Sequence, residues 1–390
     1  MMTRISLVFC LCGITFACGC GSRSGQNAAK KGMAAFKDGR NEKAIAYFTA
    51  ATERITNSPE LYYHLGLAHL KHGNLDLAQQ AFQTALGLEP VEEATPASIL
   101  GSLGQVNFHQ KEYAHALTAL DRALTSTTND AARVRLLTTL GVIEAYRENH
   151  SLARLHYLRA LRADRTYAPA LYNLSVLYQD QYGLIEEALD NLEMFVRMVD
   201  KKDRKHEVAR NRITRLQAKR DQAADRPPPR RDSARAASLL QDGMNAQFAR
   251  PPQPARAITA YKSALAADPL TFHAAYGLGN LYRQQRMYAE ALDAFKKASD
   301  INPPHQDCYC QAAEMALQLR QPAEAAKILS KAIARSPYNP ASLKLMAQTA
   351  HAQARVPEAI AYGEFYLSIL QDNKLDRDAP FERWVRDLKK

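Results

Sequence analysis

The chain has 390 residues, a formal net charge of +11 and six cysteines. Four of the cysteines fall within the first twenty residues, which excludes an evenly spaced disulfide framework. The positive charge is also local, because thirteen lysines and arginines stand against five acidic residues between Lys201 and Arg235. We therefore assign the excess charge to one connector and expect no basic nucleic-acid-binding face across the fold.

The chain begins with one arginine and an apolar run that is too short to span a bilayer comfortably, MMTRISLVFCLCGITF. Small residues, Ala17 and Gly19, then precede Cys20. This pattern resembles a bacterial lipoprotein signal. The resemblance implies that residues 1–19 are a signal peptide and that Cys20 carries the lipid, with Cys18 as the alternative site. A plain secretory signal is the alternative interpretation of the whole segment.

The stretch from Pro59 to Pro90 predicts two amphipathic helices joined by a short turn. Four residues of the first helix are spaced i, i+3, i+4 and i+7 and so share one face: Tyr62, Leu65, Gly66 and His69. Gly73 suits a left-handed helix end, and the second helix carries Ala78, Phe82 and Ala85 on one stripe. A hairpin of this size cannot cover its apolar stripe alone, so it requires neighbouring hairpins.

The chain repeats this pattern nine times. An alanine marks each second helix, at Ala44, Ala78, Ala116, Ala153, Ala188, Ala257, Ala291, Ala325 and Ala359. A large apolar residue follows four positions later in every copy except the last, which has Gly363. The pattern resembles the tetratricopeptide repeat (TPR). The resemblance implies an all-α fold, a superhelical solenoid of helical hairpins with about nine repeats in two blocks.

The repeats and connectors divide the sequence into consecutive segments. We expect an N-terminal block of about five repeats over 20–200, a basic helix plus a Pro/Arg-rich linker over 201–235, and about four repeats over 236–370. Residues 371–390 form a C-terminal capping helix. Repeat five carries an extra residue near Gly183, and the basic helix has an apolar stripe at Val208, Ile213 and Leu216.

Motifs for catalysis or metal binding are missing from the sequence. It has no His-Glu-x-x-His, phosphate loop or nucleophile elbow, and we expect neither an enzyme nor a cofactor nor a metal site. Cys308 and Cys310 lie two apart on a predicted helix and are expected to be buried thiols. Gly279 belongs to a Gly-Leu-Gly sequence that resembles part of a dinucleotide-binding fingerprint. Packing between the helices of a repeat explains this glycine without a bound dinucleotide.

Function is therefore expected from a surface. The resemblance implies that the first helix of each repeat lines a groove that holds a protein or peptide partner. By register, this groove face comprises Tyr63, Leu67 and Lys71 in repeat two, Tyr172, Val176 and Gln179 in repeat five, and His273, Tyr276, Asn280 and Arg283 in repeat seven. The alternative is that these are ordinary helix-surface residues. The two-lysine, two-asparagine clamp of some family members is not reproduced.

Together, these expectations describe a non-enzymatic protein-interaction scaffold of the bacterial cell envelope. It is lipid-anchored and faces the periplasm, and Gly21 after the cysteine favours the outer membrane over the inner one. The alternative is a binder of anionic membrane surfaces or polymers that acts through residues 201–235. An extended hinge is the third interpretation of that segment.

Overall fold

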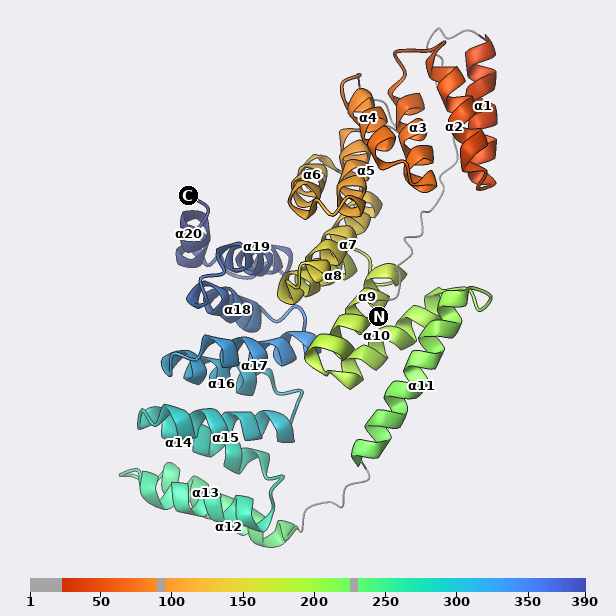
Figure 1. The fold of residues 1–390 in the computed structure, drawn as a ribbon. Helices are drawn as coiled ribbons and strands as arrows, with labels where there is room; N and C mark the ends of the chain where they lie inside the picture. The colour runs from red at the N-terminus through yellow and green to blue at the C-terminus, as the bar shows by residue number, and fades with distance from the viewer. Residues whose placement is uncertain (1–22, 90–94, 225–230) are drawn as a thin grey trace. The chain divides into compact units, whose positions relative to one another are not determined.

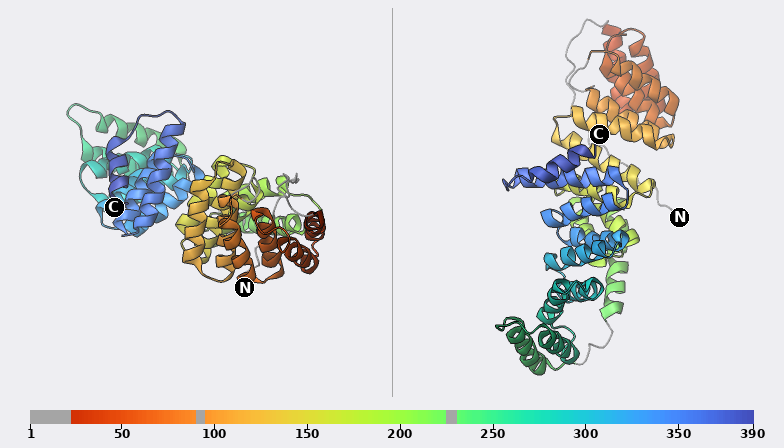
Figure 2. Two further views of the ribbon diagram at one scale, coloured as in Figure 1. Left: turned by 90° about the horizontal axis from the view of Figure 1, so that it is seen from above. Right: turned by 90° about the vertical axis from the view of Figure 1, so that its left-hand side faces the viewer.

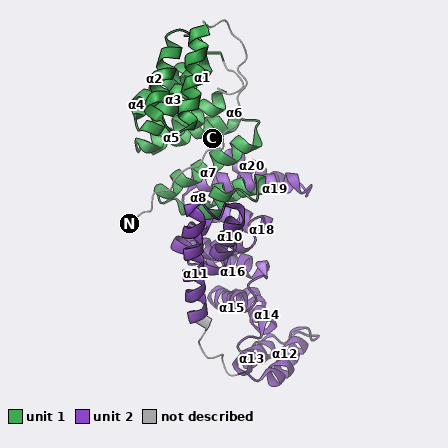
Figure 3. Cartoon of the chain, turned by 90° about the vertical axis from the view of Figure 1, so that its right-hand side faces the viewer, with its two compact units in different colours: residues 1–173 green, residues 174–390 purple. Residues whose placement is uncertain are grey.

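The computed structural model describes residues 23–89, 95–224 and 231–390, and in these ranges every regular element is a helix (Figure 1). The all-α prediction is thereby confirmed. Contacts divide the chain into two compact units, residues 1–173 and 174–390 (Figure 3). This division falls inside α9 (Ala168–Leu177), whereas the sequence placed its boundary at 201–235. Part of that linker, 225–230, lies outside the described residues, so the expected domain ranges stay a prediction.

The first unit is a series of helical hairpins. Its helices are α1 (Arg23–Lys37), α2 (Asn41–Thr52), α3 (Pro59–His72), α4 (Leu75–Leu86), α5 (Pro96–His109), α6 (Tyr113–Ser126), α7 (Asp130–Tyr146), α8 (His150–Ala163) and the beginning of α9. Each odd-numbered helix packs on the next even-numbered one, and α2, α4 and α6 pack on the following hairpin (Figure 2). We call the first helix of a hairpin helix A and the second helix B.

The second unit continues with the same hairpins after a long single helix. Its elements are the end of α9, a π-helical turn (Tyr178–Tyr182), α10 (Ile185–Met198), α11 (Arg204–Ala224), α12 (Ser233–Gln247), α13 (Pro254–Ala267), α14 (Phe272–Gln284), α15 (Tyr288–Ile301), α16 (Gln306–Gln318), α17 (Pro322–Arg335), α18 (Pro340–Ala352), α19 (Val356–Asp372) and α20 (Ala379–Asp387). Neighbouring hairpins contact through α13 and α14, α15 and α16, and α17 and α18.

Small residues on helix A let a large residue of helix B enter the hairpin. A Cβ on Gly66 would lie 2.6 Å from the Phe82 ring, and one on Gly279 would lie 2.6 Å from the Phe295 ring. The nine helix-B alanines named above are all 0% exposed. Close approach of the two backbones therefore requires small residues at fixed repeat positions, which explains the periodicity of the sequence.

The turn between helices A and B places one residue in the left-handed region. Gly73 has φ +95°, and its N–H donates to the carbonyl oxygens of His69 and Leu70. Other turns use non-glycine residues with positive φ, among them Arg286 (φ +60°) and Ala354 (φ +59°). The extra residue of repeat five is absorbed by the π-helical turn, which ends at Gly183 with φ +64°.

Helix α11 packs along α10 and buries one side of its surface. His206, Ala209 and Leu216 are buried there. The predicted stripe is wrong at Val208, which is 45% exposed. The spacing i, i+3, i+10 from His206 defines the buried side, and Val208 lies on a different side of the helix.

Helix α20 forms the end of the second unit and packs on α19. Phe381 and Val385 are its buried residues, and Trp384 makes an edge contact with His351 at 5.5 Å between ring centroids. A Cβ on Gly363 of α19 would lie 2.6 Å from Val385 Cγ2. The exception in the ninth repeat thus makes room for the terminal helix.

Candidate functional site

The predicted groove face is a side of each helix A that lies next to the side packed on helix B. The glycine–aromatic contacts described above fix which side of helix A meets helix B. In α14, Gly279 lies under Phe295, while His273, Tyr276, Asn280 and Arg283 follow the spacing i, i+3, i+7 and i+10 on another side.

In repeat two, two of the three predicted residues contribute to packing. Tyr63 is half-buried, with its ring centroid 5.9 Å from that of Phe82, and Leu67 packs against the hydrophobic cores on both sides. Lys71 is exposed, and its Nζ lies 4.1 Å from the centroid of the Phe36 ring. Of the three predicted residues in this repeat, Lys71 is therefore the one that is exposed.

In repeat five, α11 engages the last predicted residue. Gln179 Oε1 accepts a hydrogen bond from Arg212 Nε at 2.7 Å, and Arg212 also pairs with Asp180 at 3.0 Å. Tyr172 and Val176 are half-buried. Since Gln179 is bonded to another helix of the chain, this end of the groove face is partly covered.

Repeat seven gives the most polar part of the face. His273 is exposed, while Tyr276 is half-buried, with its ring centroid 5.7 Å from that of Phe295 and 5.4 Å from that of His305. The hydroxyl of Tyr276 donates to Asp307 of α16. Burial, together with this hydrogen bond, raises the pKa of Tyr276 to about 12, so the phenol stays protonated.

Arg283 joins the same two A helices. Its Nη1 donates to Gln311 Oε1 at 2.7 Å, and its Nη2 donates to Asn280 Oδ1 at 3.4 Å. Two A helices therefore share a polar surface in which an aromatic ring, two amides, a guanidinium and one carboxylate are held in place by one another. Such groups can bind an extended peptide by hydrogen bonds and ion pairs.

The sequence interpretation missed the α16 contribution to this surface. Asp307, Gln311 and Glu314 follow the spacing i, i+4 and i+7, so they share one side of α16. Glu314 also lies one repeat length, 34 positions, after Asn280. This register was the signal from which the sequence could have assigned Glu314 to the groove face. Only the structure shows that Asp307 and Gln311 have hydrogen-bond partners in the chain.

The two downstream cysteines are buried thiols, as the sequence predicted. Cys308 is 0% exposed and its Sγ lies 3.2 Å from His305 Nδ1, while Cys310 Sγ lies 3.5 Å from Ser342 Oγ. Burial raises the pKa of Cys308 to about 12, which keeps the sulfur in its poorly nucleophilic thiol form. Within the described ranges, no group of three His, Cys, Asp or Glu residues is placed to hold a metal ion.

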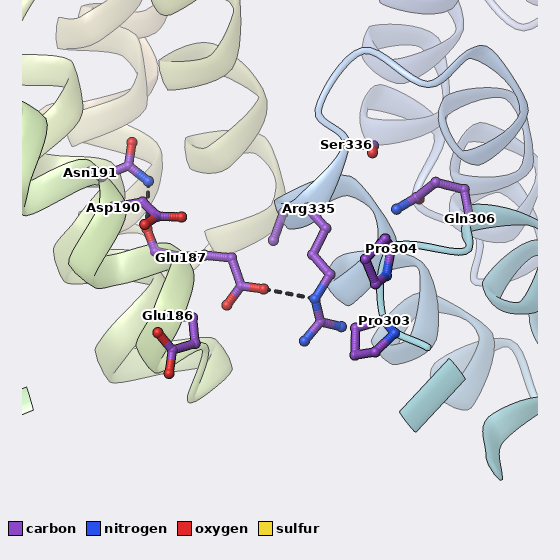
Figure 4. Close-up of a pocket in the computed structure, with 10 residues that line it drawn as sticks. Glu186, Glu187, Asp190, Asn191, Pro303, Pro304, Gln306, Arg335 and Ser336 are labelled. Carbon is purple, nitrogen blue, oxygen red and sulfur yellow. Dashed lines mark hydrogen bonds and ion pairs between the residues drawn. The ribbon is translucent and has the colours of Figure 1, made fainter. Parts of the chain in front are cut away.

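A hollow of about 500 Å³ lies elsewhere in the second unit, between α10 and the ends of α15 and α17 (Figure 4). Arg335 points across it and pairs with Glu187 at 3.0 Å between Nε and Oε1. Glu186 and Asp190 add two more carboxylates to its lining. None of the predicted site residues lines this hollow, which is separate from the groove face.

The basic segment is partly engaged by the protein itself. Besides Arg212, Arg220 pairs with Asp221 at 3.0 Å, and Arg231 makes a bidentate contact with buried Asp268 at 3.0 Å. The Arg231 guanidinium, helped by backbone and hydroxyl donors, lowers the pKa of Asp268 to about 2. Exposed basic residues remain along α11 at Arg204, Arg210, Arg215 and Lys219.

The predicted lipid-bearing residue, Cys20, lies outside the described residues, as does the whole signal segment. Among the helices that are described, none combines the length and apolar character needed to cross a bilayer.

Comparison with protein families identifies the same repeat in both units. A family model described as tetratricopeptide repeat matches residues 29–93, 63–131 and 253–305. A second model with the same description matches residues 282–348. Together they cover 29–131 and 253–348, which includes the repeat-seven groove face.

Individual relatives are distant. Superkiller complex protein 3 of Mus musculus is 25% identical over 269 residues, which cover 67% of this chain but only 17% of that protein. A solved structure of pilF from Pseudomonas aeruginosa covers 64% of this chain and 95% of its own at 16% identity, with a TM-score of 0.40. MamA from Desulfovibrio magneticus RS-1 covers 47% of this chain and 99% of its own at 18% identity, with a TM-score of 0.39.

Proposed function

Because the chain belongs to the tetratricopeptide-repeat family, we propose that it is a non-enzymatic scaffold that binds another protein. The observation that supports this proposal is the polar surface shared by α14 and α16. There Tyr276 is bonded to Asp307, and Arg283 is bonded to Gln311. These side chains are ordered before a partner arrives, so binding loses less side-chain entropy than it would on a loose surface.

The partner we propose is a protein segment held against the groove face of the second unit. Tyr276 and His273 offer ring surface, and Asn280 and Arg283 offer hydrogen-bonding groups along one helix. Tyr63 of the first unit packs on Phe82 much as Tyr276 packs on Phe295. The position of Asn280, however, is taken in the first unit by Leu67, which has no hydrogen-bonding group and packs against the cores on both sides. The second unit is therefore the better candidate for recognition.

Capture of the partner from its native envelope tests this proposal. The tagged mature chain would be cross-linked in cells, and co-purifying proteins would be compared between the wild type and an Asn280→Ala, Tyr276→Phe double variant. We expect the variant to lose at least one specific partner while keeping its helical circular dichroism. Lys297→Ala, on the exposed surface of α15, is the matched control. An unchanged set of partners in the double variant would contradict the proposal.

We also propose that the scaffold is anchored by lipid on Cys20 and faces the periplasm, at the outer membrane rather than the inner one. Support comes from the sequence alone: an apolar run, the small residues Ala17 and Gly19, and Gly21 after the cysteine. Metabolic labelling with a fatty acid tests it. Label should be incorporated by the wild type and by Cys18→Ser but not by Cys20→Ser. A wild-type chain without label would refute the anchor.

Binding of an anionic surface through residues 201–235 is the second candidate. The exposed row of Arg204, Arg210, Arg215 and Lys219 on α11 favours it. Engagement of Arg212, Arg220 and Arg231 within the second unit reduces the charge that is available.

Vesicles with and without anionic lipid separate this candidate from the scaffold. A charge-reversal variant of Arg204, Arg210, Arg215 and Lys219 would abolish binding to the anionic vesicles, and moderate salt would weaken binding of the wild type. Equal binding by wild type and variant would reject this function.

A further inference from the structure

Glu314 differs from its neighbours on the groove face because it has no partner. It is half-buried in the middle of α16, and no hydrogen bond or ion pair joins it to another residue in the described part of the chain. Burial raises the pKa of this carboxyl group, and nearby Arg283 offsets that effect in part. A carboxylate that is partly removed from water without a partner is unfavourable in the free protein.

The other two residues of the same row are already satisfied. Asp307 accepts the hydrogen bond from the Tyr276 hydroxyl, and Gln311 accepts one from Arg283 at 2.7 Å. The row therefore ends in one carboxylate that is fixed on a rigid helix and has unused acceptor capacity. This is the arrangement expected where the partner supplies the missing donor.

No cation of the surrounding helices supplies that donor. On α14, Arg283 is bonded to Gln311 and Asn280. On α18, Lys344 Nζ is 2.6 Å from Asp378 Oδ2, and the His351 ring lies against Trp384. The charged group nearest to Glu314 on its own helix is Asp307, which acts in the same direction as burial and against ionisation.

The position of Glu314 in the repeat is that of Asn280, one of the predicted groove-face residues. Asn280, Glu314 and Gln348 are spaced by 34 residues and so occupy the same position in α14, α16 and α18. Gln348 is exposed and Asn280 is half-buried. A segment that crosses these three helices would meet an amide, then a carboxylate, then an amide.

We propose that Glu314 determines the specificity of the groove, and that the segment bound there is extended and carries a lysine or arginine whose cationic group pairs with the Glu314 carboxylate. This inference rests on the proposed scaffold function and adds the chemistry of the partner. A cation that approaches Glu314 restores the interactions that burial removed, whereas an acidic segment would meet Glu314 and Asp307 with the same sign of charge.

A positional-scanning array of acetylated nine-residue peptides tests the proposal with residues 21–390, the mature chain without its lipid-bearing Cys20. We expect wild-type protein to select lysine or arginine at one position and to exclude aspartate and glutamate there. For the best peptide, replacing that lysine by norleucine should weaken binding about tenfold, which corresponds to about 1.4 kcal/mol. Acetylation removes the terminal ammonium group, so it cannot supply the cation.

The protein side of the test is Glu314→Gln, which keeps the shape and removes the charge. It should weaken binding of the lysine peptide about tenfold and leave binding of the norleucine peptide unchanged. The two replacements should then be strongly coupled in a double-mutant cycle. Glu290→Gln, an exposed glutamate on α15, is the control and should change neither. Glu314→Lys should shift the preference toward acidic residues.

Several results would overturn the proposal. These are an additive cycle, the same basic preference in Glu314→Gln, binding that requires a free amino terminus, or an array without any bound peptide. The envelope capture distinguishes this failure from failure of the scaffold function. If Asn280→Ala with Tyr276→Phe removes a partner but Glu314→Gln does not, only the specificity proposal is wrong. If neither removes a partner, the scaffold function itself is wrong.

Discussion

Replacing Gly363 by alanine should loosen the terminal helix α20. The added Cβ would lie 2.6 Å from Val385 Cγ2, whereas two carbon atoms in contact are normally about 3.5–4 Å apart. Either α20 or the Val385 side chain must then move by about 1 Å. Val385 and Phe381 are 3% and 5% exposed, so the side chain has little room and the helix itself is expected to shift.

The magnitude follows from two opposing effects. Overpacking of a well-packed site costs about 1–3 kcal/mol, while alanine in place of a helical glycine stabilises α19 by up to about 1 kcal/mol. We expect a net loss of about 1–2 kcal/mol. The loss should be confined to α20, because this helix ends the unit and packs mainly on α19.

Native-state hydrogen exchange measures that local loss. The amides of α20 should exchange about 5- to 30-fold faster in Gly363→Ala, since that is the change in the open fraction for 1–2 kcal/mol. Amides of α14 should be unaffected. Gly87→Ala is the matched control, because a Cβ there would meet only backbone carbonyl oxygens, at 3.6 Å and beyond.

A second substitution makes the test specific. Val385→Ala removes the methyl group that the new Cβ would meet, so the double variant should be more stable than the sum of the two single losses predicts. Additive losses, or unchanged exchange of α20 in Gly363→Ala, would show that the two helices do not depend on this close contact.

Three further predictions concern other parts of the second unit. Ala354→Gly relieves a positive φ and should stabilise the chain by about 0.5–1 kcal/mol in urea titrations. The control Ala352→Gly, in the last turn of α18, should not stabilise it. A gain in stability in both variants would contradict the argument. Because its folded-state pKa is raised, Glu314 contributes stability below its unfolded pKa that is lost as pH rises through the folded value. Glu314→Gln should therefore raise the melting temperature at neutral pH and less so in acid, and an equal shift at both would be inconsistent with burial of the charge. Cys308 and Cys310 should react with maleimide in the native protein at least tenfold more slowly than in urea; equal rates would mean that the thiols are accessible.

The repeats could be predicted from the sequence because their packing demands are periodic. Every hairpin needs a small residue where its two helices cross and a large one to fill the space beside it, as in Gly66 with Phe82. These demands act within about twenty residues of chain and recur every 34 residues, so one sequence displays them many times. The buried alanines and the extra residue before Gly183 were predictable for the same reason.

The candidate site was only half predictable. The groove-face positions on α14 followed from the repeat register, but their partners depend on how α14 and α16 pack. The contact of Tyr276 with Asp307, and that of Arg283 with Gln311, joins residues about thirty positions apart. Such contacts leave no periodic signal, because each pair occurs once. Glu314 could not be singled out either, since what distinguishes it is the absence of a partner.

The side of α11 that packs was misjudged for a related reason. Val208, Ile213 and Leu216 are the apolar residues that a hydrophobic pattern selects, yet Ala209 and His206 are buried and Val208 is exposed. Alanine and histidine carry weak hydrophobic signals, and α11 has no second copy in the chain against which the assignment could be compared.

Gly363 is unusual both in the sequence pattern and in its packing. As a sequence feature it breaks the rule that a large residue follows the helix-B alanine by four positions. In the structure, Gly363 leaves a space that the Val385 side chain of the next helix fills. In earlier repeats the residue at this position is large and packs against helix A of its own hairpin. A large residue at that position suits a hairpin that fills its own interior, and glycine suits one that must receive a residue from outside. The glycine four positions after the ninth helix-B alanine thus provides the space in which α20 packs on α19.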